Sequence, residues 1–218
     1  MKKVYFISGL GADRRAFNFL HLDFCHPIFI DWPPHSTSDT LPSYAEKIFD
    51  IINDEHAIVV GLSFGGMLAT EIAKKHPQTR VILISSCKTY KEIPGYLRMW
   101  RYLPLYKLYR HRLKKIASML PSKILGVEGV EQKKIQMQIL RDSNPPFTRW
   151  AIGAILHWRN TIIPSNVFHI HGTKDNLLPY KYVTADFIIQ GGAHIMVMDK
   201  AAELSEILKH RIMLPDLT

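Results

Sequence analysis

Cysteine is scarce in this sequence: Cys25 and Cys87 are the two cysteines among 218 residues. Their spacing matches no metal-binding or redox motif, which argues against a disulfide framework and a cysteine-rich metal site. A reducing cytoplasm is the simplest setting for such a chain. We therefore expect a cytoplasmic protein whose length suffices to bury a full core.

Long hydrophobic runs are also absent. No stretch approaches the roughly 18 apolar residues that a membrane helix needs. The start of the chain faintly resembles a signal peptide, because two lysines precede apolar residues 4–7, but polar residues soon interrupt the run. We expect residues 4–8 to form the first strand instead. Repeats and low-complexity tracts are lacking as well, which fits one globular domain with an insertion.

Acidic residues are scarce between residues 88 and 160, where 15 lysines and arginines stand against four aspartates and glutamates. The rest of the chain is nearly balanced, so the net charge of +9 comes from this segment. Its pattern is helical and is cut into pieces by prolines. We predict a helical cap (lid) at residues 88–160, inserted into a core made of residues 1–87 and 161–218.

What the sequence does contain is a short apolar run at residues 57–61 that leads into Gly-Leu-Ser-Phe-Gly at residues 61–65. A helical pattern follows at residues 67–75. A Gly-x-Ser-x-Gly turn between a strand and a helix is so sharp that both glycine positions must lack a side chain. Ser63 is therefore predicted to occupy a strained turn, at a helix start that favours negative charge.

Further apolar runs alternate with helical patterns along the chain. Such alternation predicts a parallel sheet that is covered by helices on both faces. One helix is expected from Ser43, with Ser43 and Glu46 as its capping box. The other expected strands are residues 27–31, 80–85, 166–170 and 185–190, and the other expected helices are a short one at 14–20 and a closing one at 200–211.

A serine nucleophile needs a base, and that base needs an orienting acid. Asp175 follows the fifth expected strand and His194 follows the sixth, so one edge of the sheet can gather them beside Ser63. Asp186 and Asp199 are weaker candidates for the acid. Asp186 begins a strand, and Asp199 is expected to cap the last helix.

Four motifs, in order along the chain, resemble those of the α/β-hydrolase superfamily. Residues 8–11 read Ser-Gly-Leu-Gly, where members often have His-Gly-x-Gly. Residues 31–38 read Asp-Trp-Pro-Pro-His-Ser-Thr-Ser, close to Asp-x-Pro-Gly-His-Gly-x-Ser. The serine motif and His-Gly-Thr-Lys-Asp at residues 171–175 complete the set, so the resemblance covers nearly the whole chain. The departures are Ser8 for histidine, and Pro34 and Ser36 for two glycines.

This resemblance implies an α/β fold of the hydrolase type. The expected sheet is compact and mostly parallel, with about six strands, helices on both faces and the helical cap. It is expected to be compact because the chain begins directly at the strand that leads to the oxyanion loop. The resemblance also implies that the backbone N–H groups of Leu10 and Phe64 form the oxyanion hole.

The expected activity is that of a serine hydrolase acting on a carboxylic ester or thioester. Ser63 forms the acyl-enzyme, His194 moves the proton and Asp175 orients the imidazole. No cofactor is expected. The fold also hosts acyl transfer, carbon–carbon bond hydrolysis and lyase reactions, which stay open as alternatives. A non-catalytic binding protein that uses the basic cap is a further alternative.

The basic cap raises the question of its partner. Residues 105–120 have helical spacing, with apolar residues roughly on one face and most basic residues elsewhere, as in a helix whose charges face water. A sharper hypothesis is that the cap engages an anionic or acyl-chain-bearing substrate, such as an acyl-thioester on a phosphorylated carrier. An anionic membrane surface is an alternative partner. Nucleic acid is not expected, because no recognition motif accompanies the charge.

Other reactive residues have simpler interpretations. His169 and His171 lie on one face of the predicted strand, because side chains alternate along it. A metal pair is conceivable, but no third ligand is evident, so packing is favoured and no metal is expected. Cys87 is expected to be a small buried residue. Asp31 and His35 are expected to shape their loop.

Overall fold

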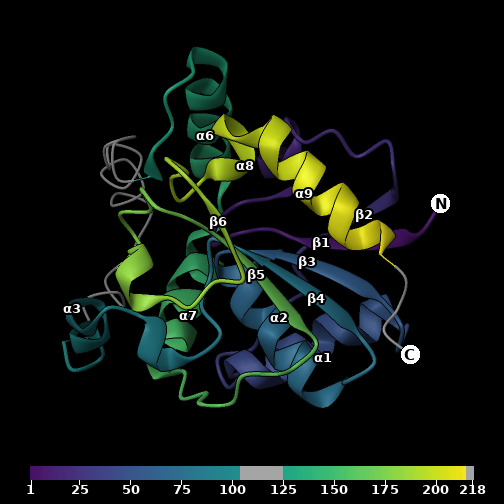
Figure 1. The fold of residues 1–218 in the computed structure, drawn as a ribbon. Coiled ribbons are helices and arrows are strands. Elements are labelled where there is room, and N and C mark those ends of the chain that lie inside the picture. The colour runs from purple at the N-terminus through teal and green to yellow at the C-terminus, as the bar shows by residue number, and fades with distance from the viewer. Residues whose placement is uncertain (104–124, 215–218) are drawn as a thin grey trace.

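The chain forms a six-stranded sheet of order β2-β1-β3-β4-β5-β6 in a computed structural model that describes residues 1–103 and 125–214 (Figure 1). Each pair of neighbouring strands is parallel. The predicted α/β fold with about six strands is therefore confirmed, and the strand ends lie within two residues of those expected. The strands are β1 (Lys3–Ile7), β2 (His26–Ile30), β3 (Ile58–Leu62), β4 (Arg80–Ile84), β5 (Val167–Gly172) and β6 (Phe187–Ile189).

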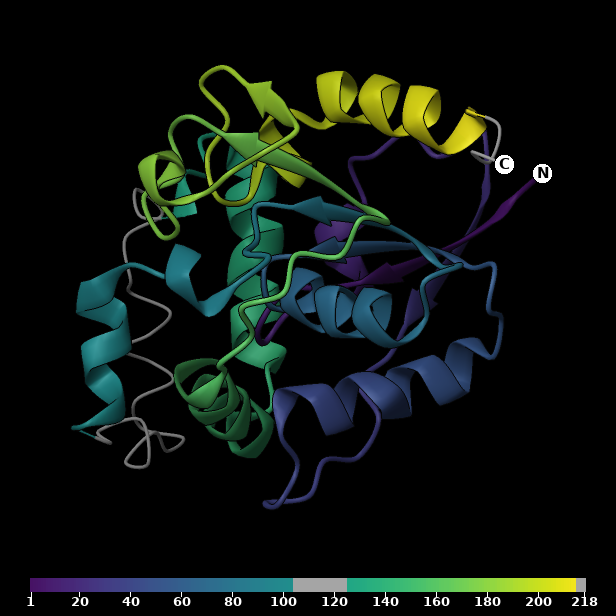
Figure 2. The ribbon, with the colours of Figure 1, turned by 60° about the horizontal axis from the view of Figure 1, so that its bottom comes forward.

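Helices cover both faces of this sheet, as Figure 2 shows from a second side. Helices α1 (Leu41–Ile52), α2 (Phe64–Lys75) and α7 (Pro145–His157) contribute to a core cluster on one face. The 3₁₀-helix η1 (Arg14–Phe17) and helices α8 (Met196–Asp199) and α9 (Ala201–Met213) contribute to the cluster on the other. The continuous apolar strands thus bury both their faces, as parallel strands do.

The segment 88–160 contributes several helical pieces. Helices α3 (Gly95–Arg98) and α6 (Val130–Asp142) lie beyond the carboxyl ends of the strands (Figures 1 and 2). Ile139 of α6 packs into one core cluster, and Phe147 of α7 packs into the other. The segment is therefore anchored on both faces of the sheet. Its remaining described pieces are the 3₁₀-helices η2 (Tyr90–Glu92) and η3 (Met99–Arg101).

The helix expected at residues 105–120 lies outside the described residues. In the part of the chain that the structure describes, no helix has the length and apolarity to cross a membrane. A last short element, the 3₁₀-helix η5 (Tyr180–Tyr182), lies between β5 and β6.

Two predicted caps are wrong. Helix α1 begins two residues before Ser43, and its N-cap is Thr40, whose hydroxyl accepts from the Ser43 N–H at 3.3 Å. Ser43 Oγ in turn accepts from the Thr40 N–H at 2.9 Å, so Glu46 has no part in the cap. Pro42 fits the first turn, where no N–H donor is needed. Asp199 ends α8 instead of capping α9, whose N-cap is Lys200 without a side-chain hydrogen bond.

The turn at the end of β3 leaves no room for side chains at its glycines. A Cβ on Gly61 would lie 2.5 Å from the Gly65 carbonyl oxygen, and one on Gly65 would meet the carbonyl oxygens of Ile7 and Ser8. Backbone atoms cannot move aside as flexible side chains can. Both glycines of the Gly-x-Ser-x-Gly motif are therefore required by sterics, as the sequence predicted.

Gly65→Ala is expected to destabilise the fold by at least about 3 kcal/mol, because the added methyl collides with two backbone carbonyls. Urea unfolding followed by circular dichroism measures the change. Gly95→Ala is the matched control, since a Cβ there meets one atom of the Arg98 side chain at 3.8 Å. We expect that control to change stability by less than about 1 kcal/mol. Equal stability of the two variants would contradict the steric account.

Candidate active site

Ser63 occupies a strained backbone conformation between β3 and α2. Its φ of 52° and ψ of −114° lie in a region that residues with a side chain rarely adopt. The surroundings hold it there: its N–H donates to the Ile84 carbonyl at 2.9 Å, and its carbonyl accepts from the Ser86 hydroxyl at 2.6 Å. The Ser63 side chain makes no capping hydrogen bond to α2, although Ser63 is the N-cap of that helix.

Ser86 was missed by the sequence analysis. It follows β4, the neighbour of β3, and a Cβ on Gly66 would meet its side chain. The pair Ser85-Ser86 at a strand end was the available signal, but a serine there has many ordinary explanations. Its hydroxyl fixes the carbonyl of Ser63 and so helps to set the orientation of the turn.

The structure brings the three predicted residues into one hydrogen-bonded chain. Ser63 Oγ lies 2.9 Å from His194 Nε2, and His194 Nδ1 lies 2.8 Å from Asp175 Oδ2. A carboxylate only accepts, so Nδ1 carries the proton and Nε2 is free to accept from the Ser63 hydroxyl. Asp175 and His194 are buried, whereas Ser63 is partly exposed. This arrangement can abstract the proton of the serine while excluding water from the acid.

Two glycines bring the loops of Asp175 and His194 together. A Cβ on Gly172, at the end of β5, would meet the backbone of Gly192, which follows β6. The Lys174 N–H also donates to the Gly192 carbonyl at 2.8 Å. The loops that follow two neighbouring strands are thereby held in contact, as expected for carboxyl ends at one sheet edge.

The Asp175 carboxylate is held in its charged form. Burial by itself raises its pKa, but the charge and hydrogen bond of His194 and the Leu178 amide outweigh burial, so the pKa lies below its ordinary value. Oδ1 accepts from the Leu177 and Leu178 amides at 2.9 and 2.8 Å. A fixed negative charge stabilises a cation on the His194 ring.

The loop that contains Leu10 lies against Ser63, because a Cβ on Gly9 would lie 3.5 Å from Ser63 Cβ. Phe64 follows Ser63 and is the first residue of α2. Within residues 1–103 and 125–214, no backbone acceptor is recorded for the N–H of Leu10 or of Phe64.

Ser8, which stands where the motif that the sequence resembles has histidine, supports this loop. Its hydroxyl donates to the Ala12 carbonyl at 2.9 Å, and Trp32 Nε1 donates to the same oxygen at 2.8 Å. The Ala12 N–H closes the turn on Gly9 at 3.0 Å. The departure from the motif thus leaves the loop held by two side-chain donors.

His169 and His171 lie behind Asp175 on one face of β5, as predicted. Their rings pack edge to face with centroids 5.2 Å apart, and both are fully buried. No group of three or more His, Cys, Asp or Glu among the described residues could hold a metal ion. Burial lowers the pKa of both rings, so they are neutral in the folded protein.

The remaining reactive residues make no recorded hydrogen bond to Ser63 in the described part of the chain. Cys87 is fully buried, and burial raises the pKa of its thiol well above its usual value, which disfavours a nucleophilic thiolate. Cys25 is also buried and unpaired. Asp31 is exposed, and His35 packs its ring against Trp150 at 5.2 Å.

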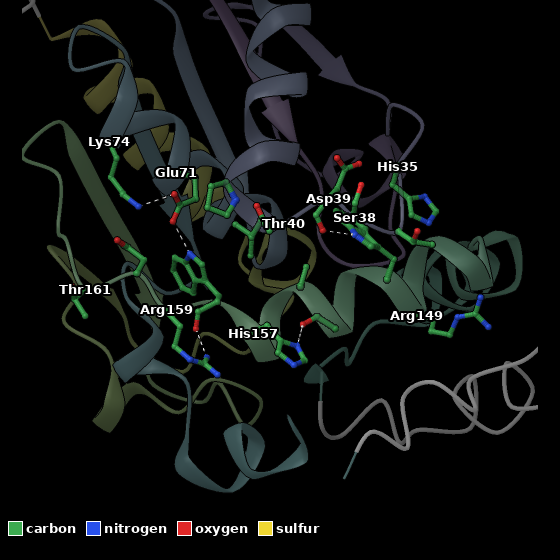
Figure 3. Close-up of a pocket in the computed structure, with 18 of the residues that line it drawn as sticks. His35, Ser38, Asp39, Thr40, Glu71, Lys74, Arg149, His157, Arg159 and Thr161 are labelled. Atoms are coloured by element: carbon green, nitrogen blue, oxygen red, sulfur yellow. Dashed lines mark hydrogen bonds and ion pairs between the residues drawn. The ribbon is translucent and has the colours of Figure 1, made fainter. Parts of the chain in front are cut away.

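A cleft of about 990 Å³ opens beside α7, and neither Ser63, Asp175 nor His194 lines it (Figure 3). Lys74 and Trp158 meet in its wall, where both donate to the Glu71 carboxylate. An aromatic layer links the cleft to the serine turn: Trp150, in the cleft wall, has its ring 6.3 Å from that of Phe64. Tyr44, Phe147 and Trp32 belong to the same layer.

This chain is similar in sequence to known proteins. The alpha/beta hydrolase family model matches residues 4–207. The 2-hydroxymuconate semialdehyde hydrolase of Pseudomonas sp. (strain CF600) is 25% identical over 171 residues, which is 72% of this chain and 59% of that protein. The chain thus spans about three fifths of the length of that relative.

Several solved structures share the fold at low sequence identity. A thermophilic esterase from Thermogutta terrifontis aligns with a TM-score of 0.74 and 14% identity, over 97% of this chain and 89% of that one. A carboxylesterase from Nitrososphaera gargenis gives 0.75 and 14%, with the same two coverages. An esterase from Exiguobacterium antarcticum gives 0.71 and 15%, over 98% and 92%. Such low identities establish the shared fold alone.

Acid is expected to destabilise the protein through its buried histidines. His169 and His171 stay neutral when folded but take up protons below about pH 6.5 when unfolded, so this stability is present above that pH and is lost as the pH falls. His169→Gln does not titrate. We expect it to reduce the pH dependence of the unfolding free energy, between about pH 7 and about pH 5, by up to about 1.4 kcal/mol per pH unit. Urea titrations measure this slope, and an unchanged slope would argue against the buried neutral ring.

Proposed function

Because the chain belongs to the alpha/beta hydrolase family, we propose that it is a serine hydrolase that cleaves a carboxylic ester or thioester. The observation that carries the proposal is the hydrogen-bonded chain from Ser63 through His194 to Asp175. A serine bonded to a base, which is in turn oriented by a buried acid, is the arrangement that acyl transfer requires. The esterases among the structural neighbours agree with this choice.

In the proposed reaction, Ser63 Oγ attacks the carbonyl carbon while His194 Nε2 takes its proton. The resulting imidazolium is stabilised by Asp175 and then gives its proton to the leaving alcohol or thiol. A water molecule, deprotonated by His194, attacks the acyl-enzyme and releases the acid. Every step uses side chains that the structure already holds within hydrogen-bonding distance of one another.

The oxyanion of each tetrahedral intermediate is assigned to the N–H groups of Leu10 and Phe64. Support comes from the contact of the Gly9 loop with Ser63, from the place of Phe64 directly after Ser63, and from the absence of a recorded backbone acceptor for either N–H within the described ranges. The N-terminus of the 12-residue helix α2 adds a partial positive charge at the same place. Two fixed donors are the usual number in such a hole.

Residues 88–160 are proposed to act as the cap over this site. Helices α3 and α6 lie beyond the carboxyl ends of the strands (Figure 2). Ser63, Asp175 and His194 follow the carboxyl ends of β3, β5 and β6. We propose that the positive charge of this segment favours a small-molecule substrate that is anionic or carries an acyl chain. Contact with an anionic membrane is the alternative use of the same charge, and nucleic acid is not proposed. Two buried, unpaired cysteines fit a reducing cytoplasm.

Hydrolysis of a carbon–carbon bond is a second candidate. The observation that favours it is the similarity to the 2-hydroxymuconate semialdehyde hydrolase of Pseudomonas. A related triad can serve both reactions, because fold and triad do not fix the bond that is cleaved. The choice between them depends on what the cap admits to Ser63.

Ser63→Ala is expected to abolish covalent labelling by a fluorophosphonate probe and to lower hydrolysis by at least about 10³-fold, because the nucleophile is removed. Intact-protein mass spectrometry measures the labelling, and peptide mapping locates it. Ser38→Ala is the control, since Ser38 is an exposed serine in the loop before α1, with its hydroxyl bonded to that of Ser36. Labelling of Ser63→Ala at another residue would contradict the assignment.

A substrate panel separates the two candidate reactions. We expect turnover of p-nitrophenyl esters or acyl-thioesters, with a preferred chain length, and little turnover of 2-hydroxymuconate semialdehyde, for which the Pseudomonas relative is named. Spectrophotometric assays of wild type and Ser63→Ala side by side measure both. Ser63-dependent cleavage of the semialdehyde without ester turnover would favour the second candidate.

A further inference from the structure

Two buried histidines stand behind Asp175 and have no part in the proposed reaction. His171 Nε2 lies 2.8 Å from the Leu178 carbonyl and 3.5 Å from Asp175 Oδ2. On its other side, His171 Nδ1 lies 3.3 Å from His169 Nε2. His171 is therefore hydrogen-bonded to the Leu178 carbonyl and to His169, and it lies next to the Asp175 carboxylate.

The acceptors around His171 determine where its proton lies. Nε2 faces the Leu178 carbonyl and the Asp175 carboxylate, which only accept, so Nε2 carries the proton. In a neutral ring Nδ1 then accepts, and its one neighbour, His169 Nε2, must donate. His169 Nδ1 then accepts, and it has no hydrogen-bond partner among the described residues. The Thr184 backbone acts on the His169 ring and raises its pKa, but burial and the charges of His171 and Lys88 outweigh this effect, so the ring stays neutral.

The Leu178 peptide connects His171 to the acid. Its carbonyl accepts from His171 Nε2, and its own N–H donates to Asp175 Oδ1 at 2.8 Å. We propose that His171, fixed in its Nε2–H tautomer by His169, is a positioning residue that anchors Leu178 and thereby orients the Asp175 carboxylate toward His194. This inference rests on the proposed function for its catalytic meaning and on hydrogen bonds for its geometry.

The charged groups around the pair favour a neutral His171. Lys88 is buried beside His169, with Nζ 3.8 Å from Asp186 Oδ2, and lowers the pKa of the His169 ring in addition to burial. His194 opposes charge on His171, while Asp175 favours it, and burial outweighs that attraction. The other buried titratable groups nearby are Cys87 and Glu92.

A neutral His171 leaves the negative charge of Asp175 available to His194. A cationic His171 would pair with Asp175 and compete with His194 for the same carboxylate oxygen, since both rings face Oδ2. A neutral donor orients the carboxylate and leaves its charge to stabilise the imidazolium of His194. His171, on β5, thus orients the Asp175 carboxylate without neutralising its charge.

The tautomers are tested directly by ¹⁵N NMR of histidine-labelled wild-type protein, with His169→Gln and His171→Gln assigning the signals. We expect both rings to be neutral Nε2–H tautomers near neutral pH and a far-downfield proton between His194 Nδ1 and Asp175. A protonated His171, or an Nδ1–H tautomer of it, would overturn the inference.

The positioning role is tested with His171→Met, which fills similar space without a donor, and His171→Gln, which keeps an N–H donor. The readout is the second-order rate constant for fluorophosphonate labelling of Ser63. We expect a loss of at least about tenfold for His171→Met and recovery to within about threefold for His171→Gln. Ile170→Val is the control, because Ile170 is equally buried on the opposite face of β5.

The outcomes are distinct. Wild-type labelling rates in His171→Met, or equal losses in His171→Met and Ile170→Val that follow their melting temperatures, overturn the inference. If His171→Met does not fold, His169→Leu, which removes only the donor to His171, replaces it with the same criteria. If wild type itself is not labelled at Ser63, the proposed function fails. The inference is then decided by the downfield proton: its loss in His171→Met with recovery in His171→Gln supports it, and its persistence overturns it.

Discussion

The close approach of three backbone segments at the end of β3 is the constraint on which the site depends. Gly61, Gly65 and Gly66 leave no room for a Cβ between β3, the first turn of α2 and the end of β1, and a Cβ on Gly66 would also meet the Ser86 side chain. That contact forces the positive φ of Ser63 and brings the loop of Leu10 against it. The fold tolerates the backbone strain at Ser63 because parallel strands on both sides of β3 and hydrogen bonds to the Ser63 backbone hold the turn in place.

The parallel sheet brings the other residues of the site to this turn. Each strand delivers a loop to the same edge, so residues more than a hundred positions apart along the chain lie within hydrogen-bonding distance. The proposed catalytic groups therefore need no long side chains or flexible segments to meet. Behind them, the strand β5 places His171 where the turn of Leu178 returns, and so the core and the proposed acid share one hydrogen-bond network.

The sequence allowed the strands, the turn and the three residues to be predicted, because each depends on local patterns and on the order of loops along a parallel sheet. Ser86 and Leu178 were not predicted, since spacing along one strand says nothing about which neighbour a side chain meets. The cap of α1 was misplaced because the Ser43–Glu46 pattern and Thr40 both satisfy the local rule, and Pro42 decides between them. The cleft beside α7 arises from packing between distant segments and has no local signal.

The strand order divides the site between two stretches of the chain. Strands β2, β1, β3 and β4 come from about the first 84 residues, while β5 and β6 join the edge of β4 from residue 167 onward. The serine turn therefore lies in one stretch and its proposed acid and base lie in the other, and the β4–β5 pairing joins the two in the sheet. Cutting the chain between β4 and β5 would leave both stretches with complete strands but would separate Ser63 from His194 and Asp175.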